Sequence, residues 1–162
     1  MKKSIIFLIF TLFTVHCSFS TVHCQTWQEM MDSTKVYQKK TDYKTALDWA
    51  KKALPKAKAE FGELDTNYYK NLNIIAELWY YQGKLDSAIY FGNETMNLAR
   101  SIYKTDHPYL AGSINNMGYF YKTIGDYAKA EPLYKEALAM TRRVYKNDHP
   151  DLAGSINNMG AF

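Results

Sequence analysis

Two histidines of this chain, His107 and His149, are of the residue type that most often binds a metal or transfers a proton. They occupy the same place in two copies of one motif, 42 residues apart. If each copy is one unit of a stack, the imidazoles lie roughly 10 Å apart, too far to share a metal whose bonds to histidine are near 2 Å. We therefore expect both histidines to cap helices, with Asp106 and Asp148 in similar capping or turn positions.

The other residue types form no pattern typical of a catalytic site. No nucleophile stands beside a base, no glycine-rich phosphate loop follows a strand, and no carboxylate pair suggests a pocket. Cys17 and Cys24 both lie in an amino-terminal segment that we expect to be removed, which leaves no thiol for a disulfide or a metal. The methionines are expected to fill the core. The sequence thus predicts no enzyme, no cofactor and no metal within these residues.

Charge excludes a second class of function. The 162 residues carry a formal net charge of +4, and Lys2 and Lys3 contribute two of these positive charges within the segment expected to be removed. The remaining charges are nearly balanced, and the lysines are dispersed along the chain. Neither feature is typical of a surface that binds nucleic acid.

The motif that contains the histidines is a repeat. Residues 107–118 read HPYLAGSINNMG, and residues 149–160 read HPDLAGSINNMG. A copy at this offset is typical of stacked-repeat proteins, in which each unit buries its apolar face against its neighbours. Apolar residues follow the helical period, and no long alternating strand pattern occurs. We expect units at about residues 25–64, 65–106 and 107–148, and a partial unit at 149–162.

Each unit is predicted to hold two helices that a tight turn connects. Helices are expected at residues 26–40, 43–61, 66–82, 85–103, 108–124, 127–145 and 150–162. A kink or break is expected at Pro55, because proline lacks an N–H and its ring crowds the preceding turn. Thr41, Gly83 and Gly125 occupy the turns. Small residues recur where the two helices of a unit must approach closely: Ala46, Ala88 and Ala130.

Several repeated positions resemble the signature of the tetratricopeptide repeat (TPR) family: Met117, Gly118, Tyr121, Gly125, Tyr127, Ala130, Tyr134 and Ala137. The 42-residue spacing, with the segments INNMG and DYAKAEPLYKEAL, is similar to the kinesin light chain-type variant. The resemblance covers residues 26–162. It implies an all-α, right-handed α-solenoid of antiparallel helix pairs, a TPR-like superhelix. It also implies a scaffold that binds extended peptides of partner proteins in the concave groove along the first helices.

The resemblance places one asparagine per unit on the groove side, namely Asn73, Asn115 and Asn157. An amide both donates and accepts hydrogen bonds, so a row of amides can bind a peptide backbone without demanding a sequence. The alternative is that these asparagines bond between neighbouring helices, and Asn116 and Asn158 are expected to serve packing. The other groove residues that we expect are Glu77, Tyr80, Tyr81, Tyr119, Lys122 and Lys35.

Residues 1–24 have the pattern of a secretory signal peptide. Two lysines precede an apolar stretch at residues 5–15, which is too short to span a bilayer. Cleavage is expected after Ser20 or Cys24, and we favour Cys24. The protein is then exported, either periplasmic or secreted, and contacts a membrane only if the leader stays uncleaved. A retained anchor helix and a lipoprotein are the weaker alternatives.

The last predicted helix presents Leu152, Ile156 and Met159 without a following helix, whereas solenoids close with a polar capping element. We therefore expect the sequence to be a fragment of a longer protein. This leaves open a second function, a sensory or recruiting arm of an enzyme such as a caspase-like (CHAT) peptidase or a sensor kinase, whose catalytic domain lies outside these residues. A structural spacer without a groove ligand is the third possibility.

Overall fold

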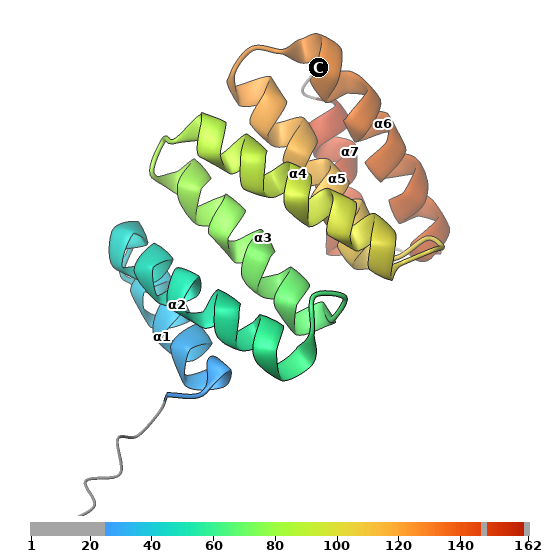
Figure 1. Cartoon of the computed structure of the whole chain (residues 1–162). Helices are drawn as coiled ribbons and strands as arrows, with labels where there is room; N and C mark the ends of the chain where they lie inside the picture. The colour runs from blue at the N-terminus through green and yellow to red at the C-terminus, as the bar shows by residue number, and fades with distance from the viewer. Residues whose placement is uncertain (1–24, 147–148, 161–162) are drawn as a thin grey trace, which may run out of the picture.

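The computed structural model describes residues 25–146 and 149–160, and this part of the chain contains helices and no strands. The helices stack side by side in chain order from α1 (blue) to α7 (red) (Figure 1), and the most extensive packing joins helices that are consecutive in the chain. The predicted all-α solenoid of antiparallel helix pairs is confirmed. The helices are α1 (Trp27–Lys39), α2 (Tyr43–Phe61), α3 (Thr66–Tyr81), α4 (Leu85–Ile102), α5 (Pro108–Thr123), α6 (Tyr127–Val144) and α7 (Pro150–Gly160).

Three tight turns join α1 to α2, α3 to α4 and α5 to α6. The residues predicted for these turns, Thr41, Gly83 and Gly125, all have left-handed backbones, with φ angles of 58°, 71° and 81°. Glycine adopts this conformation at little cost, whereas a β-branched threonine is strained in it. The first turn therefore keeps the geometry of the other two despite its different residue.

Small side chains let the helices of each pair pack closely, as the sequence predicts. Ala46, Ala88 and Ala130 have no exposed surface. Gly118 serves the same purpose between α5 and α6, because a Cβ atom there would lie 3.0 Å from Cδ1 of Tyr134. The large ring and the missing side chain are complementary, so this contact depends on both residues.

The predicted break at Pro55 does not occur, because α2 continues through this proline. Ala53 and Ala57 lie on either side of it, and both are fully buried in a cluster with Trp27 and Met31 of α1. Packing against α1 on both sides of the proline holds the two parts of α2 in one helix, which offsets the hydrogen bond that proline cannot donate.

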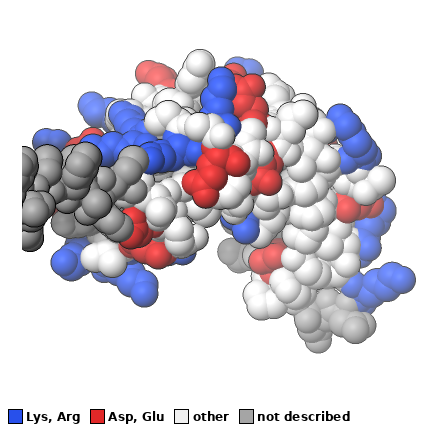
Figure 2. Space-filling view, turned by 60° about the horizontal axis from the view of Figure 1, so that its bottom comes forward, with Lys and Arg blue, Asp and Glu red and all other residues white. Residues whose placement is uncertain are grey.

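The stack is curved, and Figure 2 shows that the molecule is hollowed on one side. Within the described residues, no helix is both long and apolar enough to cross a membrane. The predicted leader and its two predicted cleavage sites lie in residues 1–24, outside the described part of the chain.

Candidate functional site

The repeated histidines cap the starts of α5 and α7. Nδ1 of His107 accepts the backbone N–H of Tyr109 at 3.1 Å, and Nδ1 of His149 accepts that of Asp151 at the same distance. A ring nitrogen that accepts a hydrogen bond carries no proton, and burial further lowers the pKa of His107. The predicted capping role is confirmed. Within the described residues no three His, Cys, Asp or Glu side chains are grouped so that they could hold a metal.

Each capping histidine also lies flat on a tyrosine from the end of the preceding helix. The ring centroids of His107 and Tyr103 are 3.6 Å apart, and those of His149 and Tyr145 are 3.7 Å apart. Asp106 does not cap α5. Instead its carboxylate pairs with the guanidinium of Arg143 from α6, which holds the pKa of Asp106 below its usual range. Asp148 lies outside the described residues.

Side-chain amides connect the first helices of successive pairs. Nδ2 of Asn116 on α5 donates to Oδ1 of Asn73 on α3 at 3.4 Å, and Nδ2 of Asn158 on α7 donates to Oδ1 of Asn115 on α5 at 3.0 Å. We call these two pairs the asparagine ladder. It fulfils the structural role that the sequence left open for these residues.

Glu77 on α3 joins this ladder. Its Oε1 accepts hydrogen bonds from Nδ2 of Asn73 at 2.7 Å and from Nδ2 of Asn116 at 3.3 Å. Burial raises the pKa of Glu77, and the two amide bonds only partly offset this effect. The carboxylate is thus held in a fixed place but surrounded by neutral partners.

Two adjoining cavities lie along the ladder. The larger, of about 600 Å³, is bounded by Asn73 and Glu77 of α3, by residues of α5 and by Asp151 of α7. The smaller, of about 270 Å³, lies between α5 and α7 and is lined by Asn115 and Asn158, among others. The cavities share the residues Pro108, Gly112, Asn116, Tyr145 and Asp151. Because the two cavities share these residues, we treat them as one depression along α3, α5 and α7, and we call it the polar groove.

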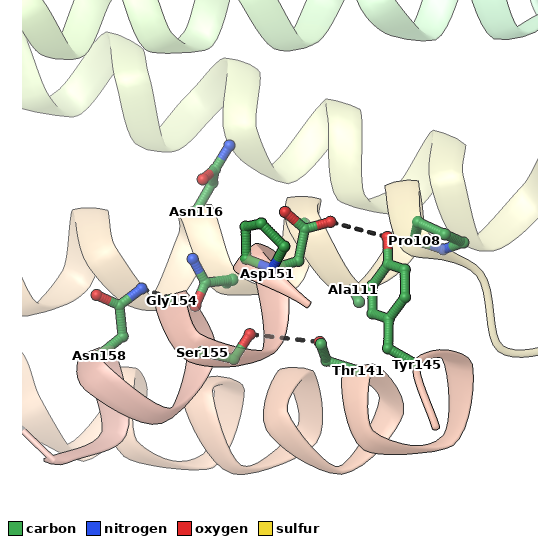
Figure 3. A pocket seen from close by; sticks show the side chains of 12 residues that line it. Pro108, Ala111, Asn116, Thr141, Tyr145, Asp151, Gly154, Ser155 and Asn158 are labelled. Atoms are coloured by element: carbon green, nitrogen blue, oxygen red, sulfur yellow. Dashed lines mark hydrogen bonds between the residues drawn. The ribbon is translucent and has the colours of Figure 1, made fainter. Parts of the chain in front are cut away.

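Figure 3 shows how the side chains of the smaller cavity are held. The hydroxyl of Tyr145 donates to Oδ2 of Asp151 at 2.8 Å, and the hydroxyls of Thr141 and Ser155 are 3.3 Å apart. These bonds join the end of α6 to α7. They hold in place the wall of the groove that α6 and α7 form.

A glycine keeps the groove open at its centre. Gly112 lines both cavities, and a Cβ atom built on it would meet no atom within 4 Å. Gly154, one repeat later, lines the smaller cavity and is equally open. Neither residue has a left-handed backbone, so the backbone does not require glycine at these two positions. The effect of each glycine is to leave the space above it open.

The structure divides the predicted groove residues into separate groups. Asn73, Asn115 and Glu77 line the polar groove, whereas Asn157 is exposed on α7 and lines neither of its two cavities. Lys35 is exposed on α1, where its ammonium lies 3.4 Å from Asp32.

The predicted tyrosines form an aromatic cluster at the carboxyl ends of α3 and α5. The hydroxyl of Tyr80 donates to that of Tyr119 at 3.1 Å, and the ring of Tyr81 stacks on Tyr43 of α2 with centroids 4.8 Å apart. Lys122 lies in the last turn of α5. The tyrosines bridge neighbouring helices, and neither they nor Lys122 line the two cavities.

Sequence reasoning missed several residues that line the groove, chiefly Gly112, Tyr145 and Asp151. For Gly112 a signal was present, since a glycine that recurs in the middle of a helix is costly without a packing or functional reason. Asp151 carried no such signal, because its counterpart one repeat earlier is Tyr109.

Comparison with known proteins identifies a segment that contains part of this groove. Residues 110–151 match the family model described as tetratricopeptide repeat. This segment is a tetratricopeptide repeat. The predicted resemblance to TPR proteins of the kinesin light chain type is confirmed. No curated protein matches the chain in sequence.

Solved TPR-type structures share the fold over 83% of the chain. BtubC (BKLC) from P. vanneervenii matches with a TM-score of 0.76 at 18% identity over 54% of its own length. A Podosopora anserina protein described as a kinesin light chain with nearly identical TPR-like repeats matches with a TM-score of 0.74 at 13% identity over 64% of its length. The chain thus spans between half and two thirds of these two proteins.

The fold is also shared with a TPR domain solved together with a ligand. The TPR2AB domain of yeast Sti1, in its pHSP90 complex, matches with a TM-score of 0.62 at 19% identity, and the match covers 83% of this chain and 46% of the other. At these identities the likeness concerns the fold. In the helix stack described here, the polar groove lies on α3, α5 and α7.

Proposed function

We propose that this TPR stack is a protein interaction scaffold that binds an extended peptide segment of a partner in the polar groove. The observation that carries the proposal is the continuous depression across α3, α5 and α7, lined by amides at successive repeats and open at Gly112. Side-chain amides can bond a peptide backbone. The fold that the chain shares with a TPR domain in a pHSP90 complex supports this type of ligand.

The asparagine ladder limits which amide atoms remain available to bind a peptide. Oδ1 of Asn73 and Oδ1 of Asn115 each accept a hydrogen bond from an asparagine of the next repeat. Nδ2 of Asn73 donates a hydrogen bond to Glu77. Nδ2 of Asn115 forms no hydrogen bond with the described residues, so it is the donor best placed to bind a peptide carbonyl. The proposal assigns no catalytic step to any of these side chains.

A steric block at Gly112 tests the groove directly. Gly112→Leu adds a side chain where a Cβ meets nothing within 4 Å, so the variant is expected to fill the groove without disturbing the core. A random peptide library displayed on phage is selected against the wild-type chain, and the selected peptides are then measured by fluorescence anisotropy. We expect Gly112→Leu to lose their binding.

Ala139→Leu is the matched control, because Ala139 is an exposed residue of α6 that does not line the groove. Selected peptides that bind Gly112→Leu as tightly as they bind wild type and Ala139→Leu would place the ligand elsewhere. A library that yields no binding peptide at all would remove the proposal.

A further inference from the structure

The charges that line the larger cavity of the polar groove are all negative. Glu77 and Asp151 contribute carboxylates, and none of the other lining residues is a lysine or an arginine. His107 also lines this cavity, but its Nδ1 accepts a backbone N–H, so the ring is neutral. The ionisable side chains of the cavity wall are therefore two carboxyl groups and a neutral histidine, with no lysine or arginine.

The ammonium group of Lys70, beside one aromatic residue of the cavity wall, is already engaged. Nζ of Lys70 on α3 lies 5.3 Å from the ring centroid of Tyr109, at the edge of the same cavity. A lysine held over an aromatic face is stabilised where it is. It does not form an ion pair with Glu77 or Asp151.

The carboxylate of Glu77 has one oxygen that the asparagine amides do not use. Both amide hydrogen bonds that fix its carboxylate go to Oε1, which leaves Oε2 without either of them. Burial raises the pKa of Glu77, which means that its surroundings do not fully compensate the negative charge. A positive group placed at Oε2 would supply that compensation, and a charge-assisted hydrogen bond in a partly buried site is stronger than a neutral one.

We infer that the polar groove recognises a lysine or arginine side chain of the partner peptide, whose charged head binds the carboxylate of Glu77 in the cavity that Asp151 also lines. The inference rests on the proposed peptide-binding function and names the chemistry of its ligand. An acidic peptide would bring like charges together in the same cavity, which disfavours binding. A volume of about 600 Å³ accommodates the long aliphatic stem of either basic side chain together with neighbouring backbone.

The sequences of the selected phage peptides provide the first test. The inference expects one position enriched in lysine or arginine among peptides that bind wild type and fail to bind Gly112→Leu. Peptides that depend on Gly112 but show no basic position, or an acidic one, would overturn the inference and leave the proposed function intact. Failure of the proposed function gives a different result, because every selected peptide would then bind Gly112→Leu as tightly as wild type.

Isothermal titration calorimetry with one such peptide provides the second test. Glu77→Gln removes the charge and keeps an oxygen that accepts the amide bonds, so the fold is expected to remain. Losing one charge-assisted hydrogen bond is expected to weaken binding roughly 10-fold or more. Replacing the basic residue of the peptide by glutamine should weaken binding similarly, and the two changes together should cost little more than either alone.

Glu60→Gln is the matched control, since Glu60 is an exposed carboxylate on α2 outside the groove. It is expected to bind the peptide like wild type. Equal affinities of Glu77→Gln and Glu60→Gln, with both variants folded by circular dichroism, would overturn the assignment of Glu77.

Discussion

Replacing Gly92 of α4 by alanine is expected to destabilise the stack, because the new methyl group has no room. A Cβ atom built there would lie 2.5 Å from Sδ of Met117 and 3.0 Å from Cε2 of Phe120, whereas ordinary contact begins near 3.4 Å. Met117 and Phe120 of α5 are buried, so neither can move into solvent. The change probes how closely α4 and α5 approach.

The magnitude is a difference between two effects. Overpacking of a core costs about 1–3 kcal/mol, and alanine in a helix regains about 0.5–1 kcal/mol relative to glycine. We therefore expect a net loss of about 1 kcal/mol for Gly92→Ala. Gly112→Ala has the same chemistry but meets no atom within 4 Å, so it should gain about 0.5–1 kcal/mol.

Urea unfolding followed by far-UV circular dichroism compares the two variants with wild type under one set of conditions. The midpoint should fall for Gly92→Ala and rise for Gly112→Ala. The reasoning is refuted if Gly92→Ala unfolds at the same urea concentration as Gly112→Ala or at a higher one, because then α4 and α5 would not be in the close contact described.

Three further changes have defined outcomes. Thr41→Gly should raise the unfolding midpoint in urea, because it removes the strain of about 1–2 kcal/mol of a threonine in the left-handed conformation. The greater conformational entropy that glycine loses on folding offsets part of this gain. Asn71→Ala should cost about 2–4 kcal/mol in the same assay, because it deprives the buried Trp27 indole N–H and Ala50 carbonyl of their partners; wild-type stability would refute this. Glu77→Gln should stabilise the fold at pH 7. Because folding raises the pKa of Glu77 above its ordinary value of 4.5, the wild type loses stability as the pH rises from 4.5 through the pKa of the folded state. The urea midpoints of wild type and Glu77→Gln should converge at the acid end of this pH range. A difference between the two midpoints that does not change with pH would contradict the raised pKa of Glu77.

Much of the fold was predictable because its determinants are local or repeat at a fixed spacing. The turns at Thr41, Gly83 and Gly125, the caps at His107 and His149, and the helical period each depend on a few neighbouring residues. Pro55 shows the limit of such reasoning. Proline locally favours a break, but the burial of side chains on both sides of it against α1 outweighs that preference.

The candidate site was predicted only in part. Asn73 and Asn115 line the polar groove, and the sequence predicted their common face. It could not show that Asn116 would bond to Glu77, because the two residues are 39 positions apart and their distance depends on how α3 and α5 pack.

The sequence by itself determined the repeat, the helix pairs, their turns and their caps, because a 42-residue period and short-range hydrogen bonding fix these features. Only the tertiary structure decided which repeated positions face a cavity. Gly92 and Gly112 are both glycines inside helices, yet one touches Met117 and the other faces open space. That difference is set by the neighbouring helix against which each glycine lies, and no residue next to it in the chain carries that information.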